Sequence, residues 1–231
     1  MERKRIKTAI IFAGCMLISI DTFAVSHSLY FGNSDFLLSN KPEAWFGRII
    51  VILVLISAVT SLVFLKSAIT DRIIGRSAMY DPIWNVEELK SHARNLFFNL
   101  SKALNNRDIS SLTSALTPEL YQKQQTIISE LVENKQINIL KNIDIQVLEI
   151  VGCEDRKEDS KDKYIVYFEG RILDYTILES TREIIKNSRR IISDFSCTYH
   201  FVRIENEWKL EQINDSVNRL DILKTKTVLE E

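Results

Sequence analysis

Few side chains in this sequence have a type and spacing that could carry out acid–base chemistry. The chain contains three histidines, His27, His92 and His200, which are far apart in sequence. His200 lies within a stretch of alternating apolar residues, Phe195, Cys197, Tyr199 and Phe201. Because successive side chains of a strand point to opposite faces, His200 is predicted to point away from the apolar face.

The carboxylates and glycines also argue against an active site. Asp144, Glu169 and Asp174 are expected at solvated strand ends, and no set of residues has the spacing of a metal site. The chain has six glycines and contains no Gly-x-Ser-x-Gly motif and no glycine-rich phosphate-binding loop. We therefore predict no enzymatic activity, no catalytic residue, no metal and no cofactor.

Aromatic and aliphatic residues offer a different function, the binding of apolar groups. The candidates for a core or for the lining of a pocket are Phe97, Leu100, Tyr121, Phe195, Tyr199, Phe201 and Trp208. Most of these side chains are expected to form a closed core, and the remainder would line a cavity.

The longest apolar stretch is a candidate membrane span. Residues 49–65 carry no charge, and Arg48 and Lys66 flank them. With a rise of ~1.5 Å per residue a helix of this length extends about 25 Å, close to the ~30 Å hydrocarbon core of a bilayer. The flanking basic side chains can reach the headgroups, and Trp45 is placed as an interfacial anchor. Residues 48–66 are therefore predicted to form a transmembrane helix; the alternative is a buried core helix.

The N-terminus resembles a targeting signal. A basic start is followed by the mostly apolar residues 9–20 and by Thr22-Phe23-Ala24, which resembles a small-residue cleavage site. Residues 1–24 are therefore predicted to be a signal peptide or an uncleaved first transmembrane segment. In both cases residues 25–47 form a short non-cytoplasmic loop.

Basic residues near the predicted span indicate its orientation. Lys66, Arg72 and Arg76 follow the span and outnumber the single acidic residue Asp71. The positive-inside rule then places the large C-terminal part in the cytoplasm. Together with Arg48, these three residues are the membrane-flanking basic residues.

Charge and cysteine usage limit the partners of the C-terminal part. Residues 82–231 have a net charge of −4, against +3 for residues 1–81. A mildly acidic domain is a poor nucleic-acid binder, because neutralisation of phosphates supplies most of that affinity. Cys153 and Cys197 form no CxxC pair and are expected to be buried and reduced.

Residues 85–220 are long enough for one domain with a single core. Helical periodicity predicts three helices, which begin after the capping residues Asn85, Asp108 and Thr117. The flanking segments are predicted to be a linker at residues 67–84 and a polar tail at residues 221–231.

The periodicity then changes to the alternation of strands. Ile143, Ile145 and Val147 alternate with polar residues. Further strands are predicted at residues 163–185, with a bulge at Gly170, and at residues 189–203 and 208–212. The predicted fold class is α+β, with three N-terminal helices packed on a curved antiparallel sheet, preceded by a signal-like segment and one transmembrane helix.

Over residues 85–215 the chain resembles the C-terminal domain of the mitochondrial import-motor anchor, the Tim44-like domain, which also occurs in bacterial membrane proteins. The resemblance is carried by Asn106-Arg107-Asp108, Leu116-Thr117-Pro118-Glu119-Leu120, Phe201-Val202-Arg203 and Trp208-Lys209-Leu210-Glu211-Gln212-Ile213. It implies a nuclear-transport-factor-two-like fold, in which helices pack into the concave side of a curved sheet and form a cone with an apolar pocket.

The chain departs from the family pattern in three respects. Leu104 stands where the family tends to carry Trp, and Cys197-Thr198-Tyr199 stands where an acidic residue and a Trp are usual. The glycine-rich stretch found before the span in bacterial relatives is absent. Family contacts made by those residues are therefore not expected here.

The resemblance implies a membrane-anchored, non-enzymatic binding domain that acts as an accessory or tethering component. The expected partners are the membrane and a polypeptide, a chaperone or the secretion machinery, with lipid as a further candidate ligand. The expected location is the cytoplasmic face of a bacterial inner membrane. One alternative is an assembly scaffold of an envelope complex similar to type IV secretion systems, whose domain faces outward, and another is a cone-fold enzyme.

Overall fold

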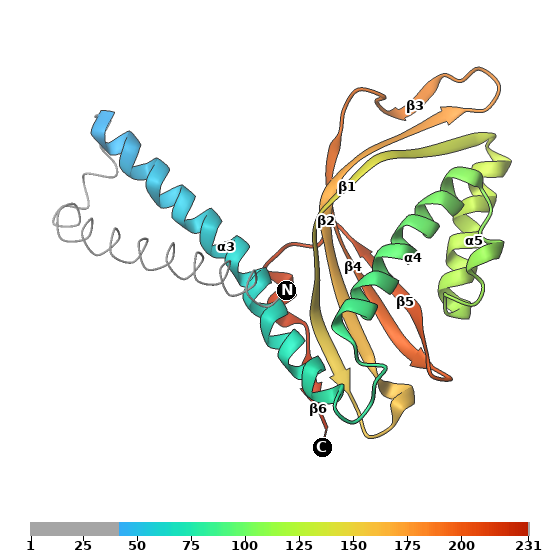
Figure 1. Cartoon of the computed structure of the whole chain (residues 1–231). Coiled ribbons are helices and arrows are strands. Elements are labelled where there is room, and N and C mark those ends of the chain that lie inside the picture. The colour runs from blue at the N-terminus through green and yellow to red at the C-terminus, as the bar shows by residue number, and fades with distance from the viewer. Residues whose placement is uncertain (1–41, 231) are drawn as a thin grey trace. The chain divides into compact units, whose positions relative to one another are not determined.

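The computed structural model of the chain describes residues 42–230 (Figure 1). The predicted signal segment, residues 1–24, and most of the predicted loop at residues 25–47 lie outside this range. The chain divides into two compact units, residues 1–60 and residues 61–231. The second unit contains the end of helix α3 and all of the following helices and strands.

Helix α3, Pro42–Ser77, includes the whole apolar stretch of residues 49–65. Large apolar side chains in this stretch are exposed, and Ile52 and Leu53 keep 55% and 59% of their surface. None of the helices in residues 42–230 combines the length and the sustained apolarity that a membrane crossing requires.

The last turns of α3 pack against the domain, although residues 67–84 were predicted to be a linker. The buried residues recur every three or four positions along one side of the helix, at Val63, Ser67, Thr70, Ile74 and Ser77. The Ser67 hydroxyl also donates a hydrogen bond to Glu149 Oε2 at 2.6 Å. Gly75 was expected to break the chain here, but it lies within the helix. Its position is exposed, and no atom lies within 4 Å of where its Cβ would be.

Two amphipathic helices follow, and both begin at the residues that the sequence indicated. Helix α4, Val86–Asn106, starts after Asn85, whose side chain accepts hydrogen bonds from two backbone N–H groups of the first turn. Helix α5, Pro118–Glu133, starts after Thr117, whose hydroxyl caps it in the same way. The middle helix predicted after Asp108 is only a single 3-10 turn, η1, Ser110–Leu112.

Six strands form one sheet in the order β5–β4–β2–β1–β6, and β3 pairs with the end of β2. Their bounds are β1 Gln136–Asp155, β2 Lys163–Leu178, β3 Ile184–Asn187, β4 Ser193–Ile204, β5 Glu207–Asp215 and β6 Thr227–Leu229. All pairs are antiparallel except β1 with β6. The predicted α+β class is confirmed, but the strand predicted at residues 163–185 ends at Leu178 and turns back into β3.

The long β1–β2 pair is irregular where Gly170 faces β1. The pairing register shifts between Lys141 and Asp144 and again between Ile145 and Val147, so the extra residues are in β1 and not at Gly170 itself. A Cβ atom on Gly170 would lie 2.1 Å from the carbonyl oxygen of Asp144. Only glycine allows this approach, and bulges of this kind bend a strand pair.

The main core lies between the sheet and the two helices, which occupy one side of it (Figure 1). Phe97 of α4 stacks on Phe168 of β2 with the ring centroids 5.0 Å apart. Phe201 of β4 stacks on Tyr164 of β2 at 4.4 Å. Both pairs join neighbouring elements through buried rings, so the aromatic residues of the sheet position α4.

A smaller core covers the opposite face of the sheet. Val63 of α3 and Ile222 pack there against Val151 and Tyr167, which point away from α4. Beyond Ile222, strand β6 pairs with residues 153–155 of β1. Residues 221–230 were predicted to belong to a polar tail, but one buried side chain and three paired residues hold them in the fold.

Gly170→Ala is predicted to destabilise the domain, because the added methyl group would overlap the Asp144 carbonyl oxygen. Overpacking of this kind costs roughly 1–3 kcal/mol, so the melting temperature of the full chain, followed by near-UV circular dichroism, should fall. Gly75→Ala is the control, because nothing lies within 4 Å of its Cβ position. It should leave the stability unchanged or raise it by up to ~1 kcal/mol. Equal melting curves for both variants would contradict the origin of the bend.

Candidate functional site

A cavity of about 730 Å³ lies where β4 begins and β5 ends, and residues of α4, β2, β4 and the segment after β5 line it. Leu104 of α4, Ile172 of β2 and Phe195 of β4 contribute to its lining from three different elements. Its volume lies within the range of ~300–1,000 Å³ that is usual for ligand pockets. The cavity is therefore large enough for a few apolar side chains or for a small molecule.

Aromatic rings form the apolar wall of this cavity. Phe97 stacks on Phe195 with the centroids 5.5 Å apart, and the ring of Tyr199 lies 5.7 Å from that of Phe97. Phe97 and Tyr199 are almost completely buried, whereas Phe195 is half-buried. Of these three rings, Phe195 therefore offers most of the accessible surface, and Phe97 and Tyr199 expose only a small part of theirs.

The predicted pocket or core residues fall into three groups. Those that line the cavity are Phe97, Leu100, Phe195 and Tyr199. Phe201 is fully buried in the core, and Trp208 is half-buried, edge-on to Trp84 at 5.0 Å. Tyr121 borders a second hollow of about 440 Å³ between η1 and α5.

Carboxylates also line the cavity, and the cavity carboxylates are called its rim. Asp174, Asp194 and Asp215 line the cavity, and none of the three forms a salt bridge with another residue in the described range 42–230. Burial raises the pKa of Asp174 above its usual range, and nearby Lys186 partly opposes this shift. The rim therefore carries negative charge that the protein does not neutralise by direct pairing.

The fourth carboxylate of the cavity, Glu169, is neutralised. Arg219 binds both of its oxygens, and the Tyr167 hydroxyl donates to Glu169 Oε2 at 2.6 Å. The hydrogen bonds from Arg219 hold the pKa of Glu169 below its usual range. Arg219 and Glu169 thus neutralise each other's charge. The net negative charge of the rim comes from the three aspartates that have no salt-bridge partner.

The sequence did not identify these acidic residues as part of a site. Asp194 stands near the start of β4 and Asp215 at the end of β5, and the two strands pair in antiparallel register around a turn at residues 205–206. Because Asp194 and Asp215 lie about ten residues before and after that turn, the two antiparallel strands place both aspartates at the same end of the sheet, and this could have been predicted from the sequence. Asp174 and Glu169 had been placed at solvated strand ends, but both lie within β2.

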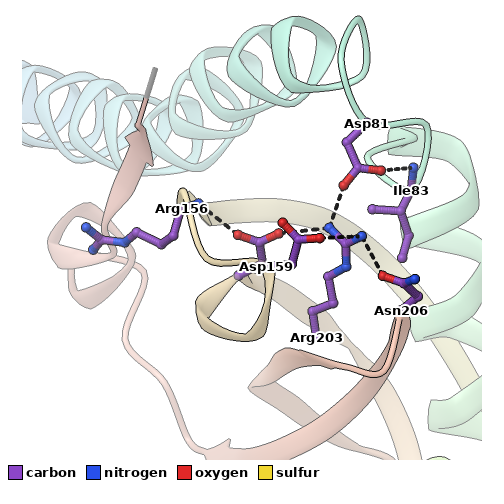
Figure 2. A network of polar contacts seen from close by, with 7 residues as sticks. Asp81, Ile83, Arg156, Asp159, Arg203 and Asn206 are labelled. Carbon is purple, nitrogen blue, oxygen red and sulfur yellow. Dashed lines mark hydrogen bonds and ion pairs between the residues drawn. The ribbon is translucent and has the colours of Figure 1, made fainter.

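A separate polar cluster is built around Arg203 of β4 (Figure 2). Its Nη1 donates to Asp162 Oδ2 at 3.1 Å and also to Asp81, and its Nη2 donates to Asn206 Oδ1 at 2.8 Å. Asp159 lies 3.2 Å from Nη2. The cluster connects the turn after α3, the loop between β1 and β2, and the turn after β4.

This cluster is structural and leaves no room for a ligand. The side chains of Arg203 and Asp162 are 7% and 1% exposed. The second oxygen of Asp162 accepts the backbone N–H of Arg156 at 2.8 Å. Both Nη atoms of Arg203 and both oxygens of Asp162 are thus used to fix three loops, whereas the buried Nε of Arg203 has no hydrogen-bond partner within the described residues.

The histidines within the described range also have structural contacts. His92 Nδ1 lies 3.0 Å from the Tyr164 hydroxyl, and His200 Nε2 lies 3.0 Å from the side chains of Thr198 and Asn214. Neither histidine lines the cavity. Burial lowers the pKa of both imidazoles, so both are neutral in the folded protein at pH 7.

The two cysteines of the domain are unreactive. Cys153 and Cys197 are buried and free, and burial raises the pKa of each thiol to about 12. A thiol with this pKa is protonated at neutral pH and is a poor nucleophile. Cys197 borders the cavity, but it contributes only apolar surface to it.

The predicted membrane-flanking basic residues have different surroundings. Lys66 Nζ donates to the carbonyl oxygen of Thr225 at 2.7 Å and to the Thr227 hydroxyl at 3.0 Å, so it holds the C-terminal segment. Arg72 and Arg76 are exposed on α3, and Arg48 is half-exposed.

The fold and the cavity define an α+β domain in which helices cover one side of a bent sheet and leave a ligand-sized space. Residues 70–215 match the family model of the Tim44-like domain. The chain belongs to this family, which confirms the resemblance seen in the sequence. The match begins within the last turns of α3, the part of that helix that packs on the domain.

The solved structures that resemble the chain include two at low sequence identity. The crystal structure of the intermembrane space region of the chloroplast protein ARC6 has a TM-score of 0.43 and 8% identity, and the likeness covers 57% of this chain and 95% of that one. The solution NMR structure of a de novo designed β-sheet protein has a TM-score of 0.33 and 8% identity, and covers 57% and 90%. No curated protein matches the sequence.

Substitution of Arg203 should be strongly destabilising. Arg203→Met leaves the buried Asp162 without its charged partner, which typically costs ~3–5 kcal/mol of stability. Arg203→Lys should also be destabilising, because an ammonium group cannot make the several hydrogen bonds of the planar guanidinium. Arg171→Met is the control, because its pair with Asp144 at 3.2 Å is half-exposed on both sides. That pair should contribute at most ~1 kcal/mol. Urea unfolding of the full chain measures all three, and similar losses for Arg203→Met and Arg171→Met would contradict the structural role.

The buried histidines should make stability depend on pH. Because folding lowers the pKa of His92 and His200, the unfolded chain binds protons more readily as the pH falls below ~6.5. The free energy of unfolding should therefore decrease with falling pH, by up to ~1.4 kcal/mol per unit for each histidine, until the pH passes the folded pKa. His92→Gln, which can still bond Tyr164, should flatten this dependence in urea unfolding between pH ~7.5 and ~5.5, a range that brackets the ordinary pKa of histidine. An unchanged slope would show that His92 is not the titrating group.

Proposed function

We propose that this chain is a membrane-associated binding domain whose cavity takes an apolar segment of a polypeptide that carries basic side chains. The observation that carries the proposal is the combination of an aromatic wall with three unpaired aspartates at one cavity. A ligand must satisfy both features, and a peptide that presents apolar and basic side chains does so.

The aromatic wall supports the choice of an apolar segment. Burial of one Leu- or Phe-sized side chain contributes roughly 1.5–3 kcal/mol. Two or three such side chains fit a cavity of about 730 Å³. After the entropy cost of association, a dissociation constant near 1 μM, about −8 kcal/mol, is expected.

The acidic rim favours a basic peptide over an anionic lipid. Asp174, Asp194 and Asp215 would repel the phosphate of a lipid headgroup and would attract lysine or arginine side chains. Lipid was a candidate ligand on the sequence alone, and an acyl chain could fit the wall. The charge of the rim nevertheless makes a polypeptide the better match.

The surroundings of the reactive residue types support binding without catalysis. His92 and His200 are engaged in structural hydrogen bonds away from the cavity, and the thiol of Cys197 is held protonated. No group of metal-binding side chains exists within the described part of the chain. Membership of the Tim44-like family accords with an anchoring or scaffolding role.

The anchoring part of the proposal rests on the sequence of residues 48–66 and on the exposed side chains of α3, such as Ile52 and Leu53. Contiguous exposed apolar surface of this kind marks interaction sites. We place the domain on the cytoplasmic face of a bacterial inner membrane; the alternative is an outward-facing scaffold of an envelope complex. A reporter that is active only outside the cytoplasm, fused after Glu231, should be silent, and an active reporter would favour the scaffold.

Binding can be measured with three labelled peptides that share an apolar core and differ only in flanking lysine, glutamine or glutamate residues. Fluorescence anisotropy with the full chain should rank them lysine, glutamine, glutamate in decreasing affinity. Asp194→Asn should weaken the lysine peptide severalfold and strengthen the glutamate peptide, because one rim charge is worth ~1 kcal/mol at this exposure.

Filling the cavity provides a second arm of the same experiment. Leu104 is half-buried at the cavity, so Leu104→Trp should block all three peptides without the overpacking expected at the fully buried Leu100. Ile127→Trp on α5 places the same side chain on an exposed surface away from the cavity and should leave binding unchanged. Equal affinity for the lysine and glutamate peptides, or full binding to Leu104→Trp, would overturn the proposal.

A further inference from the structure

The segment between β2 and β4, residues 179–192, is a lobe that stands out from the domain (Figure 1). Apart from the half-buried Ser188, every residue of this segment is exposed. Its strand β3 pairs with the end of β2 and has no strand on its other side within the described residues. The lobe therefore presents a free edge and both faces of a short hairpin to its surroundings.

The lobe concentrates two kinds of side chain that proteins rarely expose together. Its four isoleucines keep between 37% and 63% of their surface, at Ile184, Ile185, Ile191 and Ile192. Four basic residues stand beside and between them, Arg182, Lys186, Arg189 and Arg190. Exposed apolar surface next to clustered positive charge is the composition of segments that bind at a membrane surface.

The basic side chains of the lobe are not paired with carboxylates in direct salt bridges. None of its four basic residues forms a salt bridge with any residue of the described range 42–230. Arg189 is held in place by a hydrogen bond to the Arg182 carbonyl oxygen at 3.0 Å and by the ring of Tyr175 at 5.6 Å. Lys186 interacts electrostatically with Asp174 and Arg182 with Glu179, but neither pair is a direct salt bridge, so both side chains can still bind an external anion together with Arg190.

A second copy of the chain does not fit this surface. A two-fold dimer would bring the same patch of each protomer together, and the net charge of +2 on residues 179–192 would then face an equal positive charge. An anionic bilayer, in contrast, offers phosphate groups to the basic side chains and an acyl boundary to the isoleucines in one layer.

We propose that the lobe of residues 179–192 docks on the surface of an anionic lipid bilayer, with the isoleucines at the acyl boundary and Arg182, Lys186 and Arg190 at the lipid phosphates. This contact is separate from the apolar stretch of α3 and from the acidic cavity. It would give the domain a second attachment to the membrane and would limit its rotation about α3.

The test uses the full chain with an environment-sensitive NBD dye on Ile191→Cys, in a Cys15→Ser background. Cys153 and Cys197 are buried and should not react. The protein is combined with vesicles of phosphatidylcholine alone or of phosphatidylcholine with phosphatidylglycerol. The dye emission should rise and shift to the blue only with the anionic vesicles, and added salt should reverse the change because it screens exposed charges.

Charge-neutral variants separate the lobe from the rest of the protein. The triple variant Arg182→Gln, Lys186→Gln, Arg190→Gln should lower the docking equilibrium by about 100-fold, the factor given by ~1 kcal/mol per cation near an anionic surface. The matched control is Arg94→Gln, Lys102→Gln, Lys123→Gln, which removes three exposed cations from α4 and α5 and should leave the dye response unchanged.

Three results would overturn the proposal. A dye response that is equal on neutral and anionic vesicles would show that the cations play no part. An equal loss in the triple variant and in its control would show that only total charge matters. No response on either vesicle would exclude a lipid surface and leave the lobe for an acidic protein partner. None of these results bears on the cavity, whose peptide binding is measured separately.

Discussion

The close contact between Gly170 and the carbonyl oxygen of Asp144 is the constraint on which the domain depends. It allows β1 to carry its extra residues opposite β2, and the longest strand pair of the sheet bends there. Helix α4 lies in the resulting hollow and meets the sheet through the Phe97–Phe168 stack. Near the start of β4, helix α4 does not fill the space beside the sheet, and this space is the cavity. The Arg203 cluster fixes the loops at another place in the same domain.

Local signals in the sequence predicted the elements well, and long-range packing was out of their reach. The caps at Asn85 and Thr117 fixed the starts of α4 and α5, because capping depends on a few neighbouring residues. The linker and the polar tail were different in the structure, because Ile74 and Ile222 are buried by partners far away in sequence. The rim aspartates were missed for the same reason, since only the folded sheet brings Asp194 and Asp215 to the same cavity.

The two proposed surfaces differ in charge, and this difference separates their ligands. The cavity carries three unpaired aspartates and repels lipid phosphate, whereas the lobe of residues 179–192 carries four basic and two acidic residues, a net charge of +2, and attracts it. A domain that is mildly acidic overall can therefore lie against an anionic membrane through one surface and hold a basic polypeptide at another. The sequence alone gave only the net charge of the domain, in which the negative charge of the cavity and the positive charge of the lobe partly cancel.

The most direct measurement of the central claim is the position at which a bound peptide lies. A lysine-flanked apolar peptide with a benzophenone group in its apolar core is irradiated with the full chain, and the cross-linked residues are mapped by mass spectrometry. The account predicts adducts on residues 97–104 of α4 and 194–199 of β4, which form the cavity wall. Adducts confined to the hollow beside α5 or to the lobe of residues 179–192 would contradict it.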